Sequence, residues 1–136
     1  MKPARRAQFE QAVGHIRSLL AGEEVKIDSG VLRLKHAPGR HLPIVIAASG
    51  PRVLELAGRI ADGIIMLVGT IPGPIGQAIE RVRVGAAAAG RRVEAIHLIL
   101  WVPCAVSDDS PARDAVKAHV ARVVAHPLPF PLDAEE

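Results

Sequence analysis

The sequence predicts an α/β fold built on a small parallel sheet. Two nearly unbroken apolar runs, LPIVIAA over 42–48 and GIIMLV over 63–68, are each followed by a segment whose apolar residues have helical spacing. A third apolar run near the C-terminus is followed by another such segment. Continuous apolar strands are typical of parallel sheets that helices cover on both faces. Alternation of strand and helix also favours right-handed crossovers between parallel strands.

Composition narrows the class of protein. The 136 residues are 49% apolar and 23% charged, which is typical of one globular domain. We assign that domain to 1–126 and a proline-rich tail, extended or disordered, to 127–136. No apolar run reaches the ~18 residues that a membrane span needs, so no membrane partner is expected. The single cysteine, Cys104, excludes an internal disulfide and fits a reducing compartment, so a cytoplasmic location is expected.

Charge and spacing argue against two further classes of site. The net charge of +3 comes from basic residues scattered over every expected helix, and the aromatic residues Phe9, Trp101 and Phe130 lie far apart. Nucleic-acid binding needs a concentrated basic face or stacked aromatics, so we expect no nucleic-acid partner. The six histidines include no pair at i,i+4 spacing and no HExxH motif, so no metal site is expected.

A helix and a short hairpin are expected ahead of the sheet. The helix covers 3–21, because Pro3 suits a first helical position and Gly22 a helix end. Its apolar residues fall on one stripe that we expect to be buried: Phe9, Val13, Ile16 and Leu20. The segments VKID and VLRLK alternate around Ser29-Gly30, which predicts a hairpin.

Two helices should follow the first two strands of the sheet. The helix after Pro51 has a charged stripe that contains Arg52. Its opposite stripe should cover the sheet, and it consists of Val53, Leu56, Ala57 and Ile60. The loop GTIPGPIG over 69–76 is too rich in Gly and Pro to be regular. A third helix is expected from about 74 to 89.

The third strand is expected within 95–106 and a final helix within 107–125. Asp109 or Ser110 can cap that helix, with Pro111 at its first position. In the strand region, we interpret His97 and Trp101 as packed interior residues and Cys104 as a buried free thiol.

The stretch AASGP over 47–51 is the candidate binding site. A parallel strand that ends in small residues before a helix places backbone N–H groups at the carboxyl edge of the sheet, where α/β proteins bind ligands. Gly50 lets a ligand approach the main chain, Ser49 adds a hydroxyl, and Arg52 adds a positive charge. The positive end of the helix favours an anion there. The alternative is a tight turn in which Ser49 merely caps the helix.

The stretch PIVIAASGPRVLELAGRIADGIIMLVG over 43–69 resembles the luciferase-like monooxygenase family. These are flavin- or deazaflavin-dependent oxidoreductases on a TIM barrel, and the likeness extends over roughly 9–124. The resemblance implies that the turn contacts the phosphate side of a cofactor, through Ser49 and Gly50 with Arg52 and Val53 opening the helix. It implies a deazaflavin of the F420 type, as in the methylenetetrahydromethanopterin reductases, or FMN. Asp62 and Gly63 match the family but look structural, since Asp62 can satisfy loop N–H groups.

The expected fold class is therefore a partial TIM (β/α)8 barrel, with about three parallel β-α units preceded by a helix and a short hairpin. A closed barrel needs eight units and ~250 residues. We expect a C-terminal part of such an oxidoreductase, incomplete as a stand-alone catalyst, and assign no catalytic residue. An open sheet edge invites pairing, so self-association or a complementing barrel half is expected. The alternative is a non-catalytic remnant or interaction module that pairs this edge with a partner.

Overall fold

The computed structural model describes residues 6–104 together with 111, 114, 116, 117, 120 and 121. The described positions between 111 and 121 are helical, as expected for 107–125. Pro3, the two candidate caps of that helix and the tail over 127–136 lie outside the described residues. None of the described helices is both long and apolar enough to cross a bilayer.

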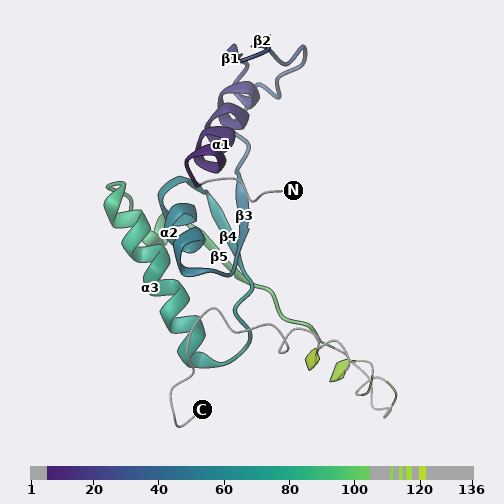
Figure 1. Ribbon diagram of the computed structural model, residues 1–136, viewed down its shortest axis with the longest axis vertical. Helices are drawn as coiled ribbons and strands as arrows, with labels where there is room; N and C mark the ends of the chain where they lie inside the picture. The colour runs from purple at the N-terminus through teal and green to yellow at the C-terminus, as the bar shows by residue number, and fades with distance from the viewer. Residues whose placement is uncertain (1–5, 105–110, 112–113, 115, 118–119, 122–136) are drawn as a thin grey trace.

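The described elements follow the expected order (Figure 1). A helix and a hairpin come first: α1 (Arg6–Leu20), β1 (Val25–Ile27) and β2 (Gly30–Leu32). The sheet strands are β3 (Val45–Ala48), β4 (Gly63–Met66) and β5 (His97–Leu100). Between them run α2 (Pro51–Ile60), α3 (Pro72–Ala88) and the short 3-10 helix η1 (Val93–Ala95).

The three sheet strands lie side by side in the order β3-β4-β5 and all run parallel. Val45 is opposite Gly63, and Gly63 is opposite His97, so the three strands start level with one another. This confirms the expected parallel α/β fold.

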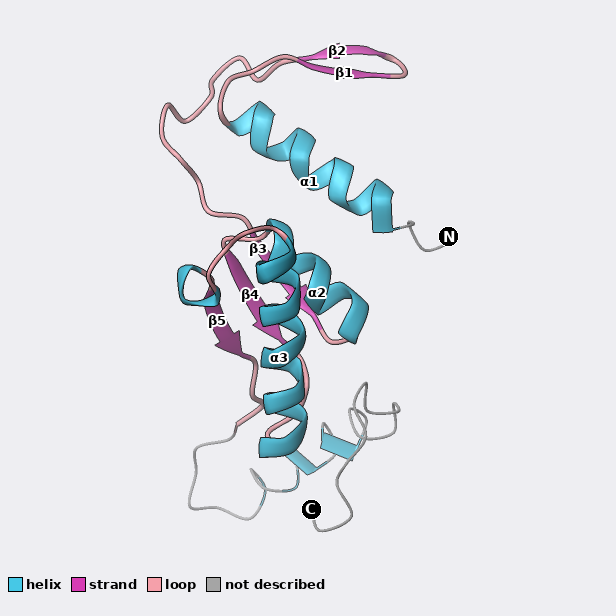
Figure 2. Ribbon diagram, turned by 90° about the vertical axis from the view of Figure 1, so that its left-hand side faces the viewer, coloured by secondary structure: helices cyan, strands magenta, loops and turns pink. Residues whose placement is uncertain are grey.

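Helices α2 and α3 pack on one face of the sheet, and Figure 2 looks through them onto the strands. Ile46 and Ala48 of β3 and Ile64 and Met66 of β4 point toward these helices and are buried. On the opposite face Val45 remains 45% exposed. The expectation that 42–48 is buried on both faces is therefore wrong, because the described helices cover only one face.

Two glycines allow α2 and α3 to cross closely. A Cβ atom on Gly85 would overlap the carbonyl oxygen of Glu55, and one on Gly58 would overlap the carbonyl oxygen of Val82. The phase of α2 also differs from the expected one, since Leu54 is fully buried whereas Val53 is 37% exposed. The backbone contact with α3 sets which arc of α2 faces inward.

The boundaries of α3 correct a second expectation. The helix begins at Pro72, so the second half of the expected irregular loop over 69–76 is helical. Prolines are tolerated there because the first N–H groups of a helix have no partner inside it.

Helix α1 is covered less than expected. It ends as expected before Gly22, whose φ of 85° suits a helix end. Val13 is its only buried residue, while Phe9 and Ile16 are 37% and 48% exposed. The expected buried stripe is therefore formed only in part.

Candidate functional site

The candidate site is the link between β3 and α2 at the carboxyl edge of the sheet. Ser49 and Gly50 form this link, and the amides of Val53 and Leu54 both donate to the Gly50 carbonyl at 3.0 Å. Gly50 is thus the N-cap residue of α2, and no side chain caps the helix. Ser49 is exposed and does not perform the capping role that was its alternative interpretation.

Nothing in the described structure requires glycine at position 50. Its φ of −80° is open to any residue, and a Cβ placed there would meet nothing within 4 Å. Gly58 and Gly85 differ, since a side chain at either would collide with a neighbouring helix. The space above Gly50 therefore fits a ligand that closely approaches the main chain.

The first turn of α2 contains a positive side chain and no negative one. The first turn contains no acidic residue, and Arg52 is exposed with no ion pair recorded to any described residue. A positive side chain at the positive end of a helix is unfavourable for the chain alone. An anion bound at this end would be stabilised by both charges.

The four residues predicted from the sequence meet in one turn, but they do not offer the same groups. Ser49, Gly50 and Arg52 are placed to present a hydroxyl, an approachable main chain and a guanidinium. The amide of Val53 is already engaged by Gly50, so Val53 can offer only its partly exposed side chain.

Three expectations for β5 and the residues after it are wrong. His97 and Cys104 are exposed, and Trp101 is 41% exposed. The reason is the uncovered face of the sheet: β5 lies at the edge of the described sheet, and no described helix packs over this side.

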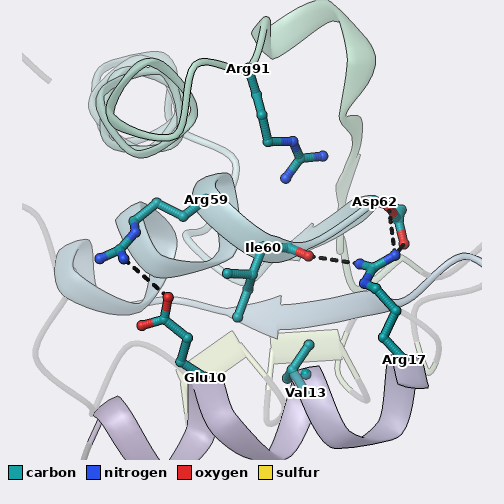
Figure 3. A pocket seen from close by; sticks show the side chains of 8 residues that line it. Glu10, Val13, Arg17, Arg59, Ile60, Asp62 and Arg91 are labelled. Carbon is teal, nitrogen blue, oxygen red and sulfur yellow. Dashed lines mark hydrogen bonds and ion pairs between the residues drawn. The ribbon is translucent and has the colours of Figure 1, made fainter. Parts of the chain in front are cut away.

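Asp62 has the structural role that the sequence predicted (Figure 3). Its Oδ2 accepts a hydrogen bond from the Ile44 amide at 2.8 Å and lies 3.0 Å from Nη1 of Arg17. Burial would raise the pKa of Asp62, but the Ile44 amide, Arg17 and His41 together hold that pKa below its ordinary value. The carboxylate therefore joins α1 to the loop ahead of β4.

Two arginines that sequence reasoning missed cap the C-terminal end of α2. Arg17 donates to the Ile60 carbonyl at 2.8 Å, and Arg91 donates to the carbonyls of Gly58 and Ala61 at 3.1 and 2.7 Å. They line a cavity of about 450 Å³ at the C-terminal end of α2, the opposite end of that helix from Gly50 (Figure 3). Because its charged groups hold secondary structure together, this cavity is not the candidate site.

Within the described part of the chain, no group of three His, Cys, Asp or Glu residues could hold a metal ion. The candidate site thus rests on main-chain groups, one hydroxyl and one guanidinium. Such a set suits an anionic group such as a phosphate.

Comparison with known proteins gives a consistent set of matches. The profile of a family described as luciferase-like monooxygenase matches residues 2–135. The chain is 33% identical over 138 residues to the 5,10-methylenetetrahydromethanopterin reductase of Archaeoglobus fulgidus. The aligned region covers 97% of this chain and 40% of that protein. It is 35% identical over 111 residues to the F420-dependent glucose-6-phosphate dehydrogenase of Mycobacterium tuberculosis, covering 77% of this chain and 33% of that protein.

Solved structures show the same fold. The coenzyme F420-dependent tetrahydromethanopterin reductase of Methanopyrus kandleri superposes with a TM-score of 0.71 at 23% identity, over 91% of this chain and 38% of that one. An F420-dependent secondary alcohol dehydrogenase in complex with an F420-acetone adduct gives a TM-score of 0.76 at 20% identity, over 97% and 43%. The resemblance identified from the sequence is confirmed by these matches.

Proposed function

We propose, because this chain belongs to the luciferase-like monooxygenase family, that it holds the phosphate side of a deazaflavin cofactor of the F420 type. The chain spans 40% of the length of the Archaeoglobus relative. We therefore also propose the activity of the complete barrel, which would be an oxidoreductase that transfers a hydride between the cofactor and an organic substrate. The proposal also includes that the chain is the C-terminal part of such a barrel and that it is located in the cytoplasm.

The observation that carries the proposal is the open main chain at Gly50, at the start of α2 and at the carboxyl edge of a parallel sheet. Ser49 and Gly50 would hold the phosphate through the main chain and the hydroxyl, and Arg52 would add its charge. The names of the relatives support F420 over FMN, the other expected cofactor.

The cofactor, when bound, supplies the hydride chemistry, and the residues of this chain bind and orient it. Ser49, Gly50 and Arg52 fix one end of the molecule, which limits the positions that its other end can reach. No described residue of this chain is assigned a catalytic role.

The test is titration of the full chain with F420 and with inorganic phosphate, comparing wild type with Gly50→Ala. We expect the thermal midpoint to be unchanged, since a Cβ at Gly50 meets nothing within 4 Å. The added methyl group should weaken both ligands about tenfold, because it occupies the space that the phosphate needs.

The matched control is Gly14→Ala in α1, where a Cβ also meets nothing within 4 Å. It should leave both affinities unchanged and slightly stabilise the helix. Equal binding by wild type and Gly50→Ala would place the phosphate elsewhere, and no F420 binding by wild type would remove the proposal.

A second candidate is an interaction module without catalysis. The uncovered sheet face favours it, because Val45 and Ile99 are 45% and 36% exposed there. Such a module should leave F420 fluorescence unchanged on titration, whereas a cofactor-binding chain should change it.

A further inference from the structure

One residue after the end of each sheet strand keeps the alignment of the strands. Ala48, Met66 and Leu100 are aligned across the strands, so the next positions, Ser49, Leu67 and Trp101, form the following row. The alignment persists there, since the Leu67 amide donates to the Ala48 carbonyl and the Trp101 amide donates to the Met66 carbonyl, both at 3.0 Å.

Strand alternation puts this row on the uncovered face of the sheet. Residues 48 and 66 face the helices and are buried, so their successors Ser49 and Leu67 face the other way. Leu67 and Trp101 are each 41% exposed. Neighbouring strands are about 4.8 Å apart, so Ser49 and Trp101 are separated by about 10 Å.

The row therefore places a polar group beside two apolar side chains. Ser49 begins the anion-binding turn, and Leu67 and Trp101 extend from it as an apolar surface that ends in an indole. An exposed indole and leucine next to an anion site fit a ligand that has both a negatively charged group and a planar apolar ring. Aromatic rings gain favourable stacking or edge contacts beyond simple burial.

We propose that Leu67 and Trp101 form a platform for the ring of the deazaflavin whose phosphate is held at Ser49 and Gly50. This inference rests on the proposed function and names the residues that orient the ring. Trp101 is then a positioning residue of the cofactor site and not a packed interior residue, as the sequence had suggested.

The chain provides its own reporter for this contact. Trp101 is the only tryptophan and the chain contains no tyrosine, so its emission comes from this one site. On titration of the full chain with F420, we expect saturable quenching of Trp101 emission. Its midpoint should match that of the F420 anisotropy, which reports binding independently of the tryptophan.

Variants separate the ring contact from the phosphate contact. Trp101→Ala and Leu67→Ala should each weaken F420 about five- to tenfold and leave inorganic phosphate binding unchanged, whereas Trp101→Phe should retain most of the affinity. Leu32→Ala in the β2 hairpin is the matched control, because Leu32 is 45% exposed and far from this row, and it should change neither affinity.

The outcomes distinguish this inference from the proposed function. If F420 binds in a manner that depends on Gly50, but Trp101 emission and the affinity of Trp101→Ala do not change, the platform is wrong and the phosphate site stands. If wild type binds neither F420 nor phosphate, both are wrong. A chromophore that lacks the phosphate should still quench Trp101, only at higher concentration, and failure to quench would also count against the platform.

Discussion

Asp62 joins three segments that are distant in the sequence. It accepts hydrogen bonds from the Ile44 amide ahead of β3 and from Arg17 of α1, while Arg17 also caps α2 at Ile60. Because its side chain is only 24% exposed, screening by solvent is reduced compared with a surface pair. This residue is thus the main polar attachment of α1 to the sheet.

Replacement of Asp62 by Asn should lower the free energy of unfolding by about 1 kcal/mol at neutral pH, since the ion pair with Arg17 is lost. The folded state lowers the pKa of Asp62, so its stabilisation is fully present above the unfolded pKa of about 3.9 and is lost as the pH falls through the lower folded value. The difference between wild type and Asp62→Asn should therefore shrink below about pH 4.

Urea unfolding over a range of pH values measures this difference. Glu10→Gln is the control, because Glu10 pairs with Arg59 across the same helices but both side chains are more exposed, at 37% and 48%. It should change stability by less than about 0.5 kcal/mol. A difference between wild type and Asp62→Asn that stays constant down to pH 2 would show that the carboxylate charge has no part in the attachment.

Individual residues could be predicted from the sequence where their role is local. Ser49 and Gly50 lie in a strand-to-helix turn whose geometry follows from a few neighbouring residues. For Asp62 the sequence predicted only that it satisfies loop N–H groups; it did not identify the donor, the Ile44 amide 18 residues away. Arg17 could not be assigned, because its partner is 45 residues away and no spacing rule connects them. Trp101 was misjudged because its burial depends on what covers a whole sheet face.

At the scale of elements, the crossing of α2 and α3 holds the site in place. The N-terminus of α2 forms the candidate site, and α3 packs directly on α2 through Gly58 and Gly85. The existence of both helices followed from their apolar periodicity. The phase of α2 did not, because it depends on the close approach of Gly58 and Gly85 to backbone carbonyls of the opposite helix, which no hydrophobic pattern records.

Gly85→Ala should therefore destabilise the fold by about 1–3 kcal/mol, because the new Cβ overlaps the Glu55 carbonyl oxygen and forces the helices apart. Thermal and urea unfolding measure the loss. Gly76→Ala is the control in the same helix, since a Cβ there meets nothing within 4 Å, and it should be neutral or slightly stabilising. Equal stability of wild type and Gly85→Ala would mean that the two helices are not in backbone contact.

The whole molecule is defined by a sheet with one covered face and one open face. Strands β3 and β5 each pair with one neighbour only among the described residues, and the open face exposes Val45 and Ile99. Unpaired edges next to apolar side chains favour association with another chain. The parallel order of the strands was predictable from their apolar runs. The open face was not, because an apolar run indicates what a strand needs to bury and not whether the covering layer is present.

We therefore expect the chain to self-associate through this face, or to accept a complementing barrel half where one is present. Sedimentation velocity over a range of concentrations should show wild type shifting to larger species. The double variant Val45→Lys with Ile99→Lys should shift the population toward monomer, because two charges on the open face oppose its burial. Its fold should persist, since both side chains are already partly exposed.

The control is Val31→Lys in the β2 hairpin, at a position 57% exposed, which should leave association unchanged. If the double variant still associates, the contact lies on another surface, such as α1 with its exposed Phe9 and Ile16. If wild type is a monomer at every concentration, the prediction is wrong.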